Sequence, residues 1–365
     1  MRFARPAVAA FAALSLLLAA CGSTPDDGAA TEDDTSTEAD TEAATDDPEP
    51  ESEGDEENDE GDDGDAEATA GELETTDVKY VVFSSGVPSR HTLAAKELGY
   101  FDEVGLDVEI VQAGSPGDVL PLLAAGEANF GFLGYEAGFN AVNAGIDLVM
   151  LRELQRNVED GQQLWAGPQS GIETVTDLEG KSVAVAGIGG FADLLLAEAL
   201  ATEDMTLDDI TLVELPPPAT IPAVLEGQVD AAWLPGPFAA SMLAQDDPPL
   251  TFVLDFEDVP ALEGIGIGPL WATRDWVEEH PNTTKTFVEV LDRIAAEFDA
   301  DPDFDREQLA LIVPEMAPEV IEQHALYPYT GPVPVERVED TQERFLQYGI
   351  TSEPVDVSSL VHEVS

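Results

Sequence analysis

The sequence has few of the residues on which disulfides, metal centres and nucleic-acid sites depend. One cysteine, Cys21, excludes an intrachain disulfide and any zinc or iron–sulfur site with several cysteine ligands. Four histidines, none paired at HxxxH spacing, leave little for a histidine-based metal centre. With 14 Lys and Arg against 76 Asp and Glu, the formal net charge is −62, and the basic clusters that bind phosphates are missing. We therefore expect no metal, no cofactor and no nucleic-acid partner.

Long apolar runs are also scarce, since no segment approaches the roughly 18 uninterrupted apolar residues of a membrane-spanning helix. Arg2 and Arg5 precede a mostly apolar stretch at 7–18, which has the length of a signal-peptide core. The stretch ends in LAAC, which resembles the lipobox of bacterial lipoproteins. The resemblance implies that 1–21 is a signal peptide and that Cys21 is lipidated, which anchors the chain to a membrane outside the cytoplasm. An ordinary signal peptide with an incidental cysteine is the alternative.

An acidic segment follows. Residues 26–77 contain 25 Asp and Glu and no Lys or Arg. Such a segment cannot bury enough apolar surface to offset its chain entropy, so 22–77 is predicted to be a disordered acidic tether with a random-coil reach of about 45 Å. The remaining 288 residues carry a net charge of −39, so the body is acidic as well.

The body contains an internal repeat. GEANF at 126–130 matches GQVDA at 227–231, an offset of 101, and the same offset relates Leu106 to Leu207 and Pro121 to Pro222. Each half alternates apolar runs with helical patterns in the order βαβαβ, with strands expected at 78–83, 108–111 and 128–133, and at 182–186, 210–215 and 229–234. This order predicts an α/β protein with two lobes, mostly parallel sheets and right-handed crossovers.

The remainder is predicted to complete the first lobe. Beyond residue 265 the pattern becomes helical, with helices expected at 274–299, 305–311, 318–324 and 338–348. We therefore assign 78–168 together with 266–365 to the first lobe and 169–265 to the second. The chain is expected to cross between them near 164–172 and 264–272.

Four segments carry a family resemblance. LGYFDEVGLDVE at 98–109 is similar to the GYF…EGLDVE signature of a solute-binding family that serves ABC importers for nitrate, sulfonates, taurine and thiamine-pyrimidine precursors. GEANFG at 126–131, DLEGKSVAV at 177–185 and QVDA at 228–231 resemble further segments of that family. The resemblance implies a type II periplasmic-binding-protein fold with a two-strand hinge and a C-terminal helical segment. Asn129 stands where the family usually has Asp, and we expect its role to be structural.

Ligands in such folds bind beyond the carboxyl ends of the strands, at helix N-termini. Arg90, the one basic residue in these loops, is predicted to pair with a carboxylate or sulfonate, unless it is a surface residue at a helix start. Tyr135, Trp233 and Phe238 could stack on a flat ligand or equally fill the core. The complete set of candidates is Ser85, Gly86, Arg90, His91, Gly114, Ser115, Gly134, Tyr135, Glu136, Gly189, Gly190, Phe191, Trp233, Pro235 and Phe238.

The resemblance implies a lipid-anchored solute-binding component that captures a small organic or anionic solute and delivers it to a permease and its ATPase. We expect a monomer and no enzyme activity. The GIGGFA segment at 187–192 fits a dinucleotide loop, but a lone match is a weak signal. Pyrimidine-synthesising relatives use a cysteine-rich segment, which this chain lacks. A solute-sensing receptor without transport stays open, as does the choice between an anion and a flat heterocycle such as a pyrimidine.

Overall fold

The structure is a computed structural model that describes residues 72–83, 87–114 and 116–364. The predicted signal peptide, the lipidated Cys21, most of the acidic tether and the candidates Ser85, Gly86 and Ser115 lie outside these ranges. None of the helices in the described ranges is both long enough and apolar enough to cross a membrane.

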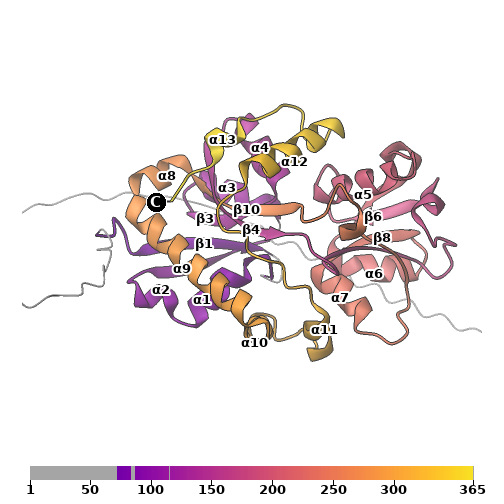
Figure 1. Cartoon of the computed structure of the whole chain (residues 1–365), viewed down its shortest axis with the longest axis horizontal. Helices are drawn as coiled ribbons and strands as arrows, with labels where there is room; N and C mark the ends of the chain where they lie inside the picture. Colours follow the sequence, from indigo (N-terminus) through magenta and orange to yellow (C-terminus); the bar gives the residue numbers. More distant parts are fainter. Residues whose placement is uncertain (1–71, 84–86, 115, 365) are drawn as a thin grey trace, which may run out of the picture. The chain divides into compact units, whose positions relative to one another are not determined.

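Two five-stranded sheets organise the body (Figure 1). The first has the order β2-β1-β3-β10-β4, with β1 at Asp77–Phe83, β2 at Asp107–Ala113, β3 at Phe130–Phe132, β4 at Leu148–Arg156 and β10 at Gly266–Thr273. The second has the order β7-β6-β8-β5-β9, with β5 at Gln162–Ala166, β6 at Ser182–Val185, β7 at Thr211–Glu214, β8 at Ala231–Pro235 and β9 at Thr251–Asp255. Strands β1 and β6 are parallel to both of their neighbours, whereas β10 and β5 pair antiparallel with both of theirs. Both sheets are thus mixed rather than mostly parallel.

Helices cover both faces of the first sheet (Figure 1). Phe287 of α9 stacks on Phe101 and Phe130 on one face, while Phe139 of α4 packs edge-on against Trp271 and Phe345 on the other. The helices are α1 (Arg90–Glu97), α2 (Tyr100–Glu103), α3 (Val119–Ala124), α4 (Tyr135–Asn143), α5 (Phe191–Ala201), α6 (Pro217–Leu225), α7 (Gly236–Leu243), α8 (Arg274–Glu279), α9 (Pro281–Ala300), α10 (Pro302–Ile312), α11 (Pro318–Gln323), α12 (Val335–Gln347) and α13 (Val357–Leu360).

The internal repeat is confirmed by the pairing of the strands, but its offset is not uniform. Tyr80 pairs with Phe130 in the first sheet, and Val183 pairs with Ala231 in the second. The offset is therefore 103 at the first strand of each half and 101 at the third. The second half is therefore two residues shorter between these strands, and the uniform offset of 101 is wrong at the first strand.

Asn129 has the structural role expected for it. Its Oδ1 accepts a hydrogen bond from the backbone N–H of Lys79 at 2.6 Å. Asp230, its counterpart in the repeat, accepts from the backbone N–H of Ser182 at 2.9 Å. Both side chains tie the start of the third strand to the start of the first, and an amide oxygen serves as well as a carboxylate for this bond.

The first lobe boundary differs from the prediction, whereas the first sheet resumes with β10 at residue 266, as predicted. Strand β5 belongs to the second sheet, so the chain leaves the first sheet after Arg156 and crosses at 157–161. The boundary predicted at residue 168 therefore lies too far along the chain. The return crossing lies at 256–265, and the residues after it form β10 rather than helix or linker. Local pattern cannot assign β5 to a sheet, because its place depends on pairing with β8 and β9, which lie much later in the chain.

Two further boundaries are corrected. The carboxylate of Glu74 accepts hydrogen bonds from the backbone N–H groups of Asn282 and Thr283, so the last residues of the predicted tether belong to the folded body. The helix expected at 274–299 is two helices, α8 and α9, because Pro281 has no N–H to continue α8 and instead begins α9.

Candidate functional site

The start of α4 on the first sheet lies against the start of α5 on the second. Gly134 caps α4 after β3, and Gly190 caps α5 after β6, as predicted for loops at the carboxyl ends of strands. A Cβ atom placed on Gly190 would lie 4.0 Å from Oε1 of Glu136. A side chain of one lobe therefore reaches the helix N-terminus of the other, as a site shared between two lobes requires.

Glu136 has an unusual environment for a carboxylate. Burial, together with the nearby charge of Asp193, raises its pKa from 4.5 to about 7, although its own backbone N–H opposes the shift. Its Oε2 has no hydrogen-bond partner among the described residues. A Cβ on Gly134 would come within 2.6 Å of both carboxylate oxygens, so the glycine makes room for the side chain to fold back.

Asp193 was not predicted as a site residue. It lies in the first turn of α5 and is 4% exposed. Its Oδ2 accepts the backbone N–H of Gly189 at 2.7 Å, while its Oδ1 has no partner within the described ranges. Burial raises the pKa of this carboxyl. One signal was present in the sequence, because Asp193 is an acidic residue inside an apolar run that directly follows the glycine loop.

The predicted residues of β8 and α7 lie together in the second lobe. Trp233, Pro235 and Phe238 line a small hollow of about 10 Å³ at the ends of β6 and β8, together with Ala186, Pro217, Thr220 and Leu234. The indole N–H of Trp233 donates to Gln162 at 2.9 Å, which fixes the orientation of the ring. Gly189 has a φ of 79°, which suits glycine in this loop, and Phe191 packs half-buried at the edge of the core.

Arg90 is not placed to bind a ligand anion. Its guanidinium is 3% exposed and pairs with Asp305, with Nε–Oδ1 and Nη2–Oδ2 distances of 2.9 Å. Nη2 also donates to the carbonyl of Tyr327 at 2.8 Å. The charge that was predicted for a solute carboxylate or sulfonate is thus neutralised within the protein, and this prediction is corrected.

His91 and Tyr135 are core residues. The ring of His91 lies 5.3 Å from that of Phe298 and 5.4 Å from that of Tyr329, and burial holds its pKa well below the ordinary value. Tyr135 is 1% exposed and donates its hydroxyl to Glu153 at 2.7 Å. Tyr135 therefore has the core role that the sequence left open beside ligand stacking, and the prediction that His91 contacts the ligand is corrected because its side chain is buried. Gly114 lies exposed at the end of β2, away from the contacts described above.

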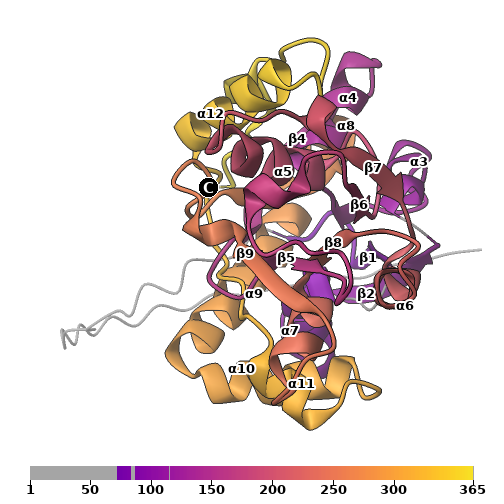
Figure 2. The same ribbon diagram turned by 90° about the vertical axis from the view of Figure 1, so that its right-hand side faces the viewer.

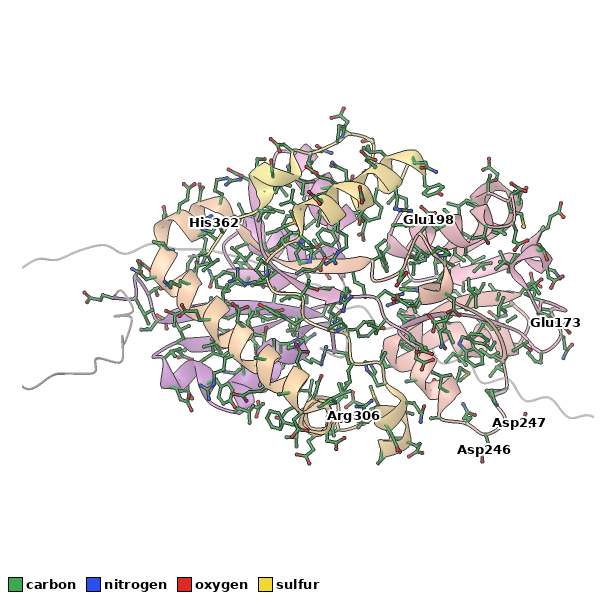
Figure 3. The ribbon with its side chains drawn as sticks, in the orientation of Figure 1. Glu173, Glu198, Asp246, Asp247, Arg306 and His362 are labelled. Carbon is green, nitrogen blue, oxygen red and sulfur yellow. The ribbon has the colours of Figure 1, made fainter. Side chains whose placement is uncertain are left out.

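The C-terminal segment also bridges the lobes. The hydroxyl of Tyr327 donates to the carbonyl of Gly161 and accepts from the backbone N–H of Gly236 at 3.1 Å. Arg344 of α12 donates to Glu198 of α5 at 2.7 Å. Glu198 is labelled in Figure 3. Helices α7 and α11 pack together (Figure 2). The prediction that the C-terminal helices pack on the first lobe is therefore incomplete, since this segment contacts both sheets' helices.

The described residues contain no group of three or more His, Cys, Asp or Glu side chains placed to hold a metal ion. The site consists of two facing helix starts, two carboxylates with free oxygen atoms and an aromatic hollow. Such a site can bind a small molecule, and its unsatisfied atoms are acceptors rather than donors.

Comparisons with known proteins agree with this architecture. A relative from Brucella abortus strain 2308, named as a binding protein, is 31% identical over 147 residues, which are 40% of this chain and 44% of the relative. A relative from Haemophilus influenzae, named for thiamine biosynthesis, is 30% identical over 140 residues, or 38% of this chain and 43% of the relative. The matches thus span less than half the length of these relatives.

The periplasmic aliphatic sulphonate binding protein SsuA of Escherichia coli has a similar fold, with a TM-score of 0.66 and 21% identity over 79% of this chain and 92% of that one. The expected periplasmic-binding-protein fold, with two α/β lobes that each hold a five-stranded sheet, is confirmed by this likeness. The model of the family described as NMT1/THI5 like matches residues 90–304, which is more than half of the sequence. The chain belongs to the NMT1/THI5-like family.

Proposed function

We propose that the chain is the solute-binding component of an ABC importer, located outside the cytoplasm and anchored by lipid at Cys21. It captures a small organic or anionic solute between its lobes and delivers it to the permease and ATPase. The approach of Glu136 to the start of α5 carries this proposal, because a ligand held there touches both lobes. The fold shared with a sulphonate-binding protein and the relative named as a binding protein support it.

Binding without chemistry is the proposed mechanism. The two crossings at 157–161 and 256–265 form the hinge. A ligand that contacts both lobes only when they are closed shifts the population toward closure, and the closed form docks on the permease. Among the sequence candidates, those that we propose for this role are Gly134, Glu136, Gly189, Gly190, Trp233, Pro235 and Phe238.

Uptake provides the test. The full-length protein is purified from its native membrane and unfolded, and the released small molecules are identified by mass spectrometry. Uptake of the identified solute is then measured in cells that lack the gene. Loss of uptake, restored by the wild-type gene, is the expected result. Normal uptake in the deleted strain would contradict the proposal and favour the sensing receptor.

Lipid anchoring has its own measurement. Cells expressing the full chain are labelled with radioactive palmitate, and the Cys21→Ser variant serves as the control. We expect label on the wild-type protein and none on the variant, which should also leave the membrane fraction. Equal labelling of both proteins would contradict lipidation at Cys21.

A further inference from the structure

The two carboxylates at the meeting of the lobes lack partners that such groups normally have. Glu136 reaches from α4 toward the start of α5, where Asp193 lies in the first turn. Oε2 of the first and Oδ1 of the second are buried and accept no hydrogen bond within the described part of the chain. A buried polar atom without a partner costs about 1–3 kcal/mol, and more when it is charged. Two such atoms side by side indicate a site that a ligand completes.

No basic side chain in the described part of the chain pairs with these two carboxylates. Within the described ranges, neither carboxylate forms a salt bridge, and Arg90 is occupied by Asp305. The loop residues at 84–86 and 115 are Ser, Ser, Gly and Ser, so they bring no charge. When ionised, the two carboxylates present negative charge and acceptor atoms, which repel a nitrate or a sulfonate group.

We infer that Glu136 and Asp193 together bind a protonated amine or amidine group of the solute. Such a group offers several N–H donors and a positive charge, and charge-assisted hydrogen bonds to carboxylates are about twice as strong as neutral ones. The inference rests on the proposed function, because it assigns the solute a chemical class at the same site. Each lobe supplies one carboxylate, so the cation itself links the lobes in the closed form.

Aromatic rings lie near the loop that leads to Asp193. Ala186, which follows β6, and the rings of Trp233 and Phe238 line the same small hollow. At about 10 Å³ this hollow is too small to hold an organic group, so we expect a flat or apolar body on the cationic group to lie against the rings rather than inside the hollow. Aromatic faces also attract cations. The expected class is a small organic cation with an amine or amidine head.

A binding experiment on the full-length protein tests the inference. Benzamidine, agmatine and putrescine serve as cationic probes, ethanesulfonate and nitrate as anionic probes, and benzamide as the neutral match of benzamidine. Calorimetry in about 0.5 M NaCl, where the Debye length is about 4 Å, suppresses general attraction to the acidic surface. The variants are Glu136→Gln and Asp193→Asn, each confirmed to be folded by its thermal unfolding curve. Their matched controls are Glu127→Gln and Asp208→Asn, at exposed positions of the same two lobes.

We expect at least one cationic probe to bind, benzamide to bind more weakly than benzamidine, and each site variant to weaken cation binding by about tenfold or more. The controls should leave affinity unchanged. Binding of ethanesulfonate or nitrate that Glu136→Gln preserves or strengthens would overturn the inference while the proposed function stands. Failure of all three cations, or binding of Ca²⁺ alone at this pair, would also overturn it. Uptake by the deleted strain decides the proposed function separately.

Discussion

Replacing Glu136 with Gln should make the unliganded protein more stable at neutral pH. The folded-state pKa of this carboxyl is about 7, against 4.5 in the absence of the fold. Because folding raises the pKa, burial of this carboxyl costs no ionisation free energy at pH values below its unfolded-state pKa, where it is protonated in both the folded and the unfolded state. The cost grows as pH rises through the window between the two values and is complete above the folded one.

The size of this effect follows from the shift. One pKa unit corresponds to about 1.36 kcal/mol. The side chain of Glu136 keeps some contact with solvent, which reduces the effect of the shift. We therefore expect the ionised carboxylate to destabilise the folded state by about 2–3 kcal/mol at pH 8. A neutral amide avoids this cost. At about 2–3 °C for each kcal/mol in a domain of this size, Glu136→Gln should raise the melting temperature by roughly 4–8 °C.

The assay is urea unfolding of the full-length wild type and variant at pH 5 and pH 8, with Glu127→Gln as the control. The gain in the free energy of unfolding should be smaller at pH 5 than at pH 8 by about 2 kcal/mol. A gain that is the same at both pH values, or a variant that is less stable at pH 8, would refute the reasoning. The second result would mean that the partial positive charge at the start of α5 stabilises the ionised carboxylate, so Glu136 would act as a latch between the lobes.

Three further substitutions test other parts of the structure. Arg90→Met should lower the free energy of unfolding by about 3–5 kcal/mol in urea, because Asp305 stays buried without its partner; a loss below 1 kcal/mol would contradict the buried pair. Gly138→Ala should cost about 1–3 kcal/mol in thermal unfolding, since the added methyl group falls on the ring of Trp271, and a neutral result would mean that the helix moves aside freely. Gly189→Asp should weaken binding of the best cationic probe, because a side chain strains a loop residue with a φ of 79° and disturbs the bond from its N–H to Asp193. Unchanged affinity in that variant would place the site elsewhere.

The sequence predicted best what depends on local pattern. The strands that became β1, β2 and β3, and their counterparts in the second half, are apolar runs followed by turn residues, so their order and parallel pairing could be derived. The strands β5 and β10 were assigned to crossovers. Their place in a sheet depends on contacts with residues far along the chain, and the sequence of β5, QQLWA, has little apolar pattern of its own.

The same limit explains the site. Arg90 was selected as the one cation near the strand ends. Only the fold reveals that it forms an ion pair with Asp305, which lies 215 residues later. Glu136 was included because it follows β3, whereas Asp193 was read as part of an apolar helix. The two carboxylates come together because the lobes approach each other, and no residue spacing in the sequence indicates that the lobes meet at these positions.

The acidic composition fits a cationic solute better than an anionic one. The 288 residues after the acidic segment carry a net charge of −39, which raises the local concentration of cations and lowers that of anions at low salt. A cation attracted by this field would meet, between the lobes, two carboxylates whose oxygen atoms lack partners. The long-range field then speeds encounter, and the Glu136–Asp193 pair supplies the selective contact. We therefore expect added salt to lower the association rate of a cationic probe. The ratio of wild-type to Glu136→Gln affinity should change little, because salt screens the buried contact much less than the surface field.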